Sequence, residues 1–253
     1  MVNLKHRLFA ASLHLFISLV IAGLAWALIT RFLYPYPFIE ISGGRQLFLL
    51  LVLVDIALGS VLTFSVFSSG KLRGVLMRDL MVICTLQLVA LGYGLWTMYL
   101  ARPVYLVHEI DRFKVVTAAD LAESDLSSAP AAFRKTPLFG IQTIGIRPAR
   151  DSADKLRSLD LELAGQDLSL QTDWWQSISE ENRISMRKHG KPISLLRQKA
   201  QDGGAELDKI LHAANVSDDE ALAFPLLTRL ASWSIVLDKR DLQIIGHLPV
   251  DLF

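Results

Sequence analysis

Three long hydrophobic stretches fill most of the first hundred residues, at Leu8–Ile29, Leu47–Phe67 and Leu80–Leu100. Each is close to the roughly 20 residues that a helix needs to cross a bilayer. Residues 101–253 contain no further stretch of this kind and carry an ordinary density of charged side chains. The pattern predicts a three-helix transmembrane bundle over residues 1–100 and a separate α+β domain over residues 101–253.

The second domain is predicted to start directly after the third span. Proline cannot continue a helical hydrogen-bond ladder, so Arg102-Pro103 should end that helix. Patterns typical of strands and helices then alternate. Strands are expected at Val104–Ile110, Phe113–Thr117 and Phe139–Ile146, and helices at Ala118–Leu126, Arg150–Leu163, Asp173–Lys188 and Ala205–Ala214. Ser217 and Glu220 have the spacing of a capping box. Trp233–Leu237 and Leu242–Ile245 should form a hairpin around the polar loop 238–241.

The positive charges indicate an orientation. Lys5 and Arg7 precede the first span, and Lys71, Arg73 and Arg78 lie between the second and third. Because cytoplasmic loops are enriched in lysine and arginine, these segments are predicted to be cytoplasmic and the C-terminal domain to lie outside. The aromatic residues of the outer loop 30–46 are expected at the membrane interface.

Composition excludes several classes of protein. Residues 1–100 have a net charge of +4 and residues 101–253 of −3, so no basic nucleic-acid-binding surface is expected. The single cysteine, Cys84, rules out an internal disulfide and a cysteine-based zinc site. His108-Glu109 begins a zinc-protease motif, but Arg112 occupies the position of the second histidine. We therefore expect neither an enzyme nor a bound cofactor.

Asp55 lies in the middle of the second span and opposes its insertion into the membrane. On insertion scales, an aspartate at such a position is unfavourable by about 2.5–3.5 kcal/mol. At 1.5 Å per residue, His14 and Gln87 lie at a similar depth to each other, whereas Tyr93 is nearer the depth of Asp55. The depths favour the Tyr93 hydroxyl or a group of a bound ligand as the partner of Asp55. A protonated, hydrogen-bonded Asp55 inside the bundle and a functional Asp55 are both consistent with the sequence.

Asp55, Gly59 and Thr63 follow one another at intervals of four and so share a helix face. A small residue in such a stripe lets another helix approach closely. The stripe is predicted to face protein, either within this chain or in a second membrane protein.

Three segments resemble the type IV pilin accessory proteins of the TfpX/TfpZ family. They are residues 53–63 (LVDIALGSVLT), Tyr99–Lys114 (YLARPVYLVHEIDRFK) and Gly246–Asp251 (GHLPVD). The resemblance covers most of the chain. Ser60 and His108 depart from the family pattern, which has a proline and an aromatic residue there, so no proline kink is expected at position 60.

The resemblance implies a multi-pass protein of the bacterial inner membrane with a periplasmic C-terminal domain. It also implies a non-catalytic, chaperone-like role in which the protein binds the major type IV pilin. Membrane lipids and other pilus assembly proteins are the further partners that it implies. Candidate contacts with the pilin helix are His14, Asp55, Gly59, Thr63 and Gln87, and candidate periplasmic contacts are Arg102, Tyr105, Glu109, Asp111 and Arg112. The charged periplasmic residues also fit a solvated strand edge. A membrane-anchored sensor, or a subunit of another inner-membrane complex, is the alternative function.

Overall fold

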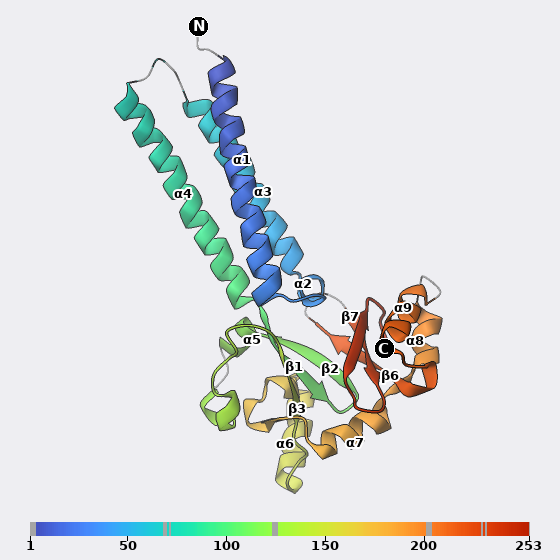
Figure 1. Cartoon of the computed structure of the whole chain (residues 1–253). Coiled ribbons are helices and arrows are strands. Elements are labelled where there is room, and N and C mark those ends of the chain that lie inside the picture. The colour runs from blue at the N-terminus through green and yellow to red at the C-terminus, as the bar shows by residue number, and fades with distance from the viewer. Residues whose placement is uncertain are drawn as a thin grey trace. The chain divides into compact units, whose positions relative to one another are not determined.

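The computed structural model describes residues 4–67, 70, 72–122, 126–200, 204–228, 230 and 232–252. The chain divides into two compact units, Met1–Ala101 and Arg102–Phe253. The first contains three long helices and the second a mixed sheet with short helices (Figure 1). The predicted class, apolar helices followed by an α+β domain, is confirmed.

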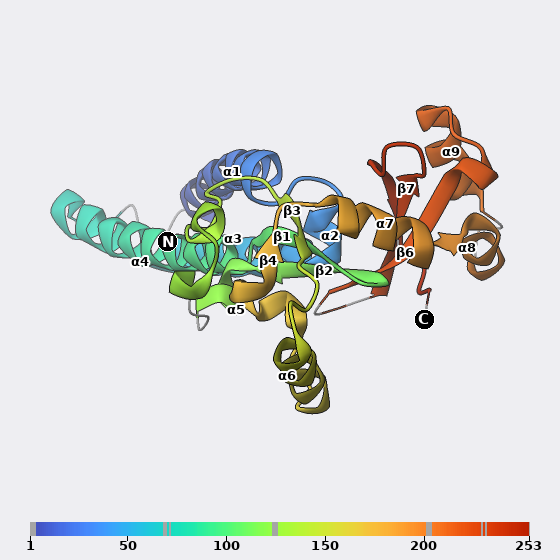
Figure 2. The same ribbon diagram turned by 90° about the horizontal axis from the view of Figure 1, so that it is seen from below.

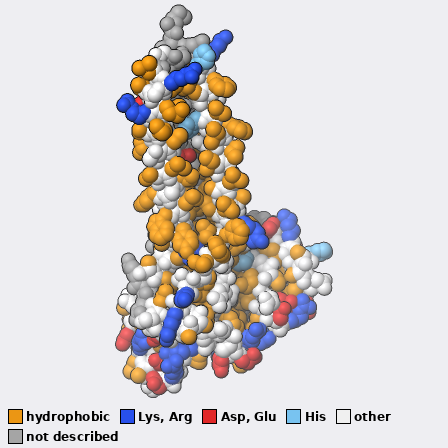
Figure 3. All heavy atoms as spheres, turned by 60° about the vertical axis from the view of Figure 1, so that its left-hand side comes forward, with side chains coloured by type: hydrophobic (Ala, Val, Ile, Leu, Met, Phe, Trp, Pro, Cys, Tyr) orange, Lys and Arg blue, Asp and Glu red, His pale blue; other side chains and the backbone are white. Residues whose placement is uncertain are grey.

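Three helices of the first unit are long and apolar enough to cross a membrane. They are α1 (Leu4–Leu28), which continues into the π-helical turn η1 (Ile29–Leu33), α3 (Gly44–Val66) and α4 (Arg73–Leu100). On the face shown in Figure 3, hydrophobic side chains predominate along these helices. Helix α4 begins at Arg73, seven residues before Leu80, where the predicted span starts. The helix extends beyond the hydrophobic stretch and includes the polar residues Arg73 and Arg78.

Helix α3 is the centre of the helical unit. It packs against both α1 and α4, whereas the described parts of α1 and α4 make few contacts with each other. Trp26 of α1 lies 4.9 Å from Phe48 of α3 between ring centroids. On the other side, Leu51 of α3 fills the space over Gly94 of α4. Both outer helices are therefore fixed by their contacts with α3.

The connection between the first two spans packs as part of the core. It contains the short helix α2 (Phe38–Ile41). Tyr34 is fully buried and donates a hydrogen bond to the main-chain oxygen of Met98 at 2.8 Å. Of the aromatic residues predicted to lie at the membrane interface, Tyr34 is part of the apolar cluster at this end of the helices and Phe38 is also buried. Tyr36 is 80% exposed, so only its side chain is accessible among these three.

The C-terminal unit is built on one eight-stranded sheet with the order β4-β3-β1-β2-β6-β7-β8, in which β5 also pairs with β6. The strands are β1 (Pro103–Glu109), β2 (Arg112–Thr117), β3 (Gln142–Ile146), β4 (Trp175–Gln176), β5 (Lys191–Pro192), β6 (Ala221–Leu227), β7 (Ser232–Asp238) and β8 (Ile244–Leu248). Among the described residues, two pairs join β2 to β6, Phe113–Leu226 and Lys114–Leu227. The sheet therefore consists of two well-paired halves with a narrow parallel join.

The described residues of this unit also form the α-helices α5 (Ala118–Ala122), α6 (Ser152–Leu163), α7 (Glu180–His189), α8 (Ile193–Lys199) and α9 (Ala205–Ala214). Single 3-10 turns lie at η2 (Leu126–Ser128), η3 (Ala131–Phe133), η4 (Leu168–Leu170), η5 (Thr172–Trp174) and η6 (Asp218–Glu220). Helices α8 and α9 cover one face of β6–β8, whereas α6 projects away from the sheet (Figures 1 and 2).

Each half of the sheet has its own apolar core. Tyr105 of β1, Phe133 and Trp175 pack together beneath the first half, with the Tyr105 and Trp175 ring centroids 4.8 Å apart. Leu207 and Leu211 of α9 pack on the second half. The first core thus contains packed aromatic rings, and the second packs a helix face against the sheet.

The central strand β6 was not predicted, because its sequence ALAFPLL contains a proline and lacks the polar alternation of a half-exposed strand. The predicted helix Asp173–Lys188 is wrong over its first part. Trp174 ends a 3-10 turn and Trp175 begins β4, and both indoles are buried. The helix begins at Glu180, after a capping box between Ser179 and Asn182.

The other elements lie close to their predicted positions. Helix α9 has its predicted bounds, and β7 and β8 form the expected hairpin, although their connection extends to Gln243. The predicted helix Ala118–Leu126 ends at Ala122, and its residues 123–125 lie outside the described residues. The capping box at Ser217 is present but leads into a single 3-10 turn.

Candidate functional site

All five residues expected to contact the pilin helix lie in one cluster, three of them on α3 and one each on α1 and α4. Thr63 Oγ1 lies 3.1 Å from His14 Nδ1 of α1. Gln87 Nε2 of α4 donates to the main-chain oxygen of Asp55 at 3.2 Å, with the Asp55 carboxylate at 3.4 Å. The intramembrane cluster, defined as His14, Asp55, Gly59, Thr63 and Gln87, thus joins all three long helices.

The neighbour of Asp55 differs from the predicted one. Tyr93 is 73% exposed on α4, whereas Gln87 reaches Asp55. Straight, parallel helices with equivalent ends would separate the depths of Gln87 and Asp55 by about one and a half turns. Helix tilt and the long glutamine side chain account for the difference.

Gly59 lets the polar side chains meet. A Cβ atom at this position would lie 1.9 Å from Gln87 Nε2 and 2.6 Å from His14 Nε2. Both distances are far below van der Waals contact. The amide of Gln87 and the imidazole of His14 therefore occupy the space that a larger side chain at position 59 would need. Gly59 and Thr63 are buried, while His14, Asp55 and Gln87 are half-buried. In Figure 3 an acidic and a histidine side chain interrupt the hydrophobic surface of the helices. The cluster is therefore partly open.

Two of the candidate periplasmic contacts are interior residues. Arg102 is 2% exposed, and its Nη2 donates to the main-chain oxygen of Pro137 at 2.9 Å. Tyr105 is fully buried in the aromatic core of the first half-sheet. These positions hold the strand β1 to the segment before β3, and a partner has no access to their side chains.

The remaining candidates lie at the end of β1 and in the turn that follows. Glu109 accepts a hydrogen bond from the Ser169 amide at 2.9 Å, and burial raises the pKa of this carboxyl. Asp111 and Arg112 form an ion pair at 2.8 Å, and their side chains are about half exposed. Burial opposes ionisation of Asp111, but the hydrogen bond and charge of Arg112 lower its pKa. The Asp111–Arg112 turn is the accessible part of this segment.

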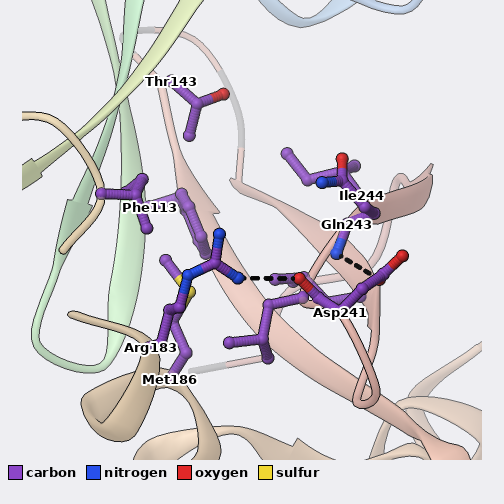
Figure 4. A pocket seen from close by; sticks show the side chains of 10 residues that line it. Phe113, Thr143, Arg183, Met186, Asp241, Gln243 and Ile244 are labelled. Atoms are coloured by element: carbon purple, nitrogen blue, oxygen red, sulfur yellow. Dashed lines mark hydrogen bonds between the residues drawn. The ribbon is translucent and has the colours of Figure 1, made fainter. Parts of the chain in front are cut away.

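A cavity of about 340 Å³ opens between α7 and the two halves of the sheet (Figure 4). Its walls combine apolar side chains with an arginine and a few polar groups, from Phe113, Thr143, Ile178, Arg183, Met186, Leu237, Asp241, Leu242, Gln243 and Ile244. Arg183 donates to the main-chain oxygen of Asp241 at 3.0 Å. Such a cavity is at the small end of ligand pockets.

This cavity could not be predicted from the sequence, because its walls come from strands and loops far apart along the chain. One of its walls has an unusual backbone conformation. Leu242 has a φ of 62°, a left-handed conformation that is rare for a branched residue. Among the described residues no group of three or more histidine, cysteine, aspartate or glutamate side chains could hold a metal ion.

Comparisons with known proteins cover the whole chain. It is 31% identical to the fimbrial assembly protein of serogroup I of Dichelobacter nodosus, and 30% identical to that of serogroup E1, over 99% of both chains in each case. The fimbrial assembly protein of serogroups C1 and C2 is 35% identical over half of this chain and 99% of its own. A family model described as fimbrial assembly protein FimB matches residues 2–43. No solved structure matches the chain significantly.

The architecture is that of a membrane protein with three candidate spans, a polar cluster among them and a single mixed-sheet domain. Within this class, the chain belongs to the fimbrial assembly protein (FimB) family. The resemblance to pilin accessory proteins is supported at this broader level.

Proposed function

We propose that this protein is an inner-membrane accessory factor that binds the major type IV pilin and modulates its stability or its assembly into pili without catalysing a reaction. The observation that carries the proposal is the full-length similarity to fimbrial assembly proteins. The TfpX/TfpZ resemblance adds the pilin as partner, and the positive charges before α1 and α4 add an orientation with the C-terminal unit in the periplasm.

The intramembrane cluster supports the membrane half of this proposal. Polar side chains inside a bilayer are costly and commonly mark functional contacts. Here Asp55 and Gln87 satisfy each other only through long hydrogen bonds, at 3.2 and 3.4 Å, and stay half-buried. A polar group on a pilin helix would gain hydrogen bonds from this cluster at the cost of these weak internal ones. We propose that the cluster is the recognition point for the pilin helix.

For the periplasmic half we propose the Asp111–Arg112 turn as the contact with the pilin head. The two charged side chains are accessible, unlike Arg102 and Tyr105 on the same strand. Ile110, which precedes them, is 61% exposed and adds an apolar centre to the charged turn. Interfaces commonly combine an apolar centre with a charged rim.

The test is recovery of pilin with the purified protein. The double variant Asp55→Ala/Gln87→Leu should lower pilin recovery about five- to tenfold, because two intramembrane hydrogen bonds contribute roughly 0.6 kcal/mol each. Recovery is measured by quantitative immunoblotting of detergent extracts, and surface pili are counted in the same strains. Deletion of the gene should reduce surface pili or total pilin.

Tyr93→Leu is the matched control, since it also replaces a polar side chain in a span but at an exposed position of α4. It should leave pilin recovery unchanged. Undiminished recovery with the double variant would contradict the membrane contact, and normal piliation after gene deletion would contradict the proposed function as a whole.

A further inference from the structure

Helix α6 exposes a row of leucines that no described part of the chain covers. Leu156, Leu159 and Leu163 are 64%, 53% and 87% exposed. Their spacing of three and four residues places them on one face, in the a and d positions of a helix seam. Isolated exposed leucines are ordinary, but three in register on a projecting helix indicate a contact surface (Figure 2).

The opposite face of α6 is fixed to its own domain by two ion pairs. Arg147 pairs with Asp154 at 2.6 Å and also lies over the Trp174 ring at 4.2 Å. Arg157 pairs with Asp173, also at 2.6 Å. These contacts hold the first two turns of α6, while the leucines stay exposed. The leucine face is therefore displayed by a fixed helix.

The charges beside the leucines point to a second copy of this chain. In a heptad numbering that places Leu156 at position a and Leu159 at position d, Lys155 occupies the preceding g position. Asp160 occupies the e position that follows Leu159. In a parallel pair these two positions face each other across the seam, so Lys155 of each copy would meet Asp160 of the other. Both side chains are exposed, and neither forms an ion pair with another described residue.

We propose that α6 pairs in parallel with α6 of a second copy, with the three leucines in matching layers and two Lys155–Asp160 ion pairs at the flanks. An antiparallel pair would place leucines opposite the polar Ser152 or leave one without a layer, so parallel pairing uses all three. The proposal is independent of pilin binding, because it concerns a surface that shares no residue with the intramembrane cluster.

A seam of three turns is short. Stable interfaces bury about 1,200–2,000 Å² in total, more than one such helix pair provides. Pairing therefore depends on the high local concentration of copies that share a membrane. It is expected in the full-length protein in a bilayer, and that is where it should be tested.

The experiment is disulfide cross-linking of the full-length protein in membranes, in a Cys84→Ala background. Leu159→Cys should form a homodimer under mild oxidation at least about fivefold faster than Lys209→Cys, a cysteine on the exposed face of α9. Equal rates for the two variants, or cross-linking of Leu159→Cys only to a different protein, would overturn the proposal.

Charge exchange tests the register. Added to Leu159→Cys, either Lys155→Asp or Asp160→Lys should slow cross-linking by placing like charges across the seam. The combination Lys155→Asp/Asp160→Lys should restore the original rate. Failure of the combination to restore it, while each single change slows cross-linking, would overturn the parallel pair.

Discussion

Replacement of Gly59 by leucine is expected to force the transmembrane helices apart and to deplete the protein from the membrane. Even a methyl group at this position would meet Gln87 and His14 well inside contact distance. Overpacking of this kind costs about 1–3 kcal/mol, and the displaced Gln87–Asp55 and His14–Thr63 contacts add to the loss. The steady-state amount in membranes and the thermal unfolding of detergent-purified protein measure the effect.

Gly92→Leu is the matched control. It adds the same side chain to a glycine in the third span, but no atom lies within 4 Å of a Cβ there. The Gly92→Leu protein should accumulate and unfold like the parent protein. If Gly59→Leu were equally stable, the three-helix arrangement around Gly59 would be incorrect.

The Gly59 variant also separates two roles of the intramembrane cluster. Its residues satisfy one another within the chain, which makes them part of the packing, and they are also half-open, which makes them available to a partner. Gly59→Leu disturbs both roles. Asp55→Ala/Gln87→Leu leaves the close approach at Gly59 in place and removes only the polar groups. Normal accumulation with reduced pilin recovery in the double variant would assign the polar groups to recognition.

The membrane half of the molecule could be predicted from the sequence because its signals are local. A run of apolar residues specifies a span, and the interval of four from Asp55 to Gly59 to Thr63 specifies a shared face. Which residue on another helix would meet that face could not be predicted. It depends on helix tilt and on the reach of a side chain, and Gln87 rather than Tyr93 was the result.

The sheet was harder to predict for a related reason. Strands β1, β2, β7 and β8 have short-range hairpin signals, but β6 lies between them and pairs with β2 across more than a hundred residues of chain. A strand in the middle of a sheet is apolar on both faces and so loses the alternation that marks exposed strands. The cavity that Arg183 lines depends on that pairing, so it too could not be predicted from the sequence.

His108 lies at this join between the two halves of the sheet. It is 1% exposed, and neither ring nitrogen has a hydrogen-bond partner among the described residues. The ring packs 5.1 Å from Phe113 and 6.0 Å from Phe224 between centroids. Burial lowers the pKa of His108 to about 4, with a further lowering by His189 that Asp111 partly opposes. The folded domain therefore strongly favours the neutral ring.

Acid is accordingly expected to loosen the C-terminal unit in a defined pH range. A group whose folded pKa lies below its unfolded value contributes its full stability above the unfolded pKa and loses it as the pH falls. For His108 the range runs from about 6.5 down to about 4, and the gap corresponds to about 3 kcal/mol. Burial also lowers the pKa of His247 to about 4, so this residue acts in the same direction. Hydrogen exchange of β1 peptides in the full-length protein, corrected for intrinsic pH dependence, should report the loss.

His108→Phe should remove the His108 part of this loss, because a phenyl ring fits between the two phenylalanines and does not titrate. Protection of β1 in this variant should fall less between pH 6.5 and pH 4 than in the parent protein. The control, His212→Gln, changes an exposed histidine of α9 and should keep the parental pH dependence. Parallel acid profiles for His108→Phe and the parent would show that His108 is not the group that destabilises the join, and would make the half-buried His247 the next histidine to test.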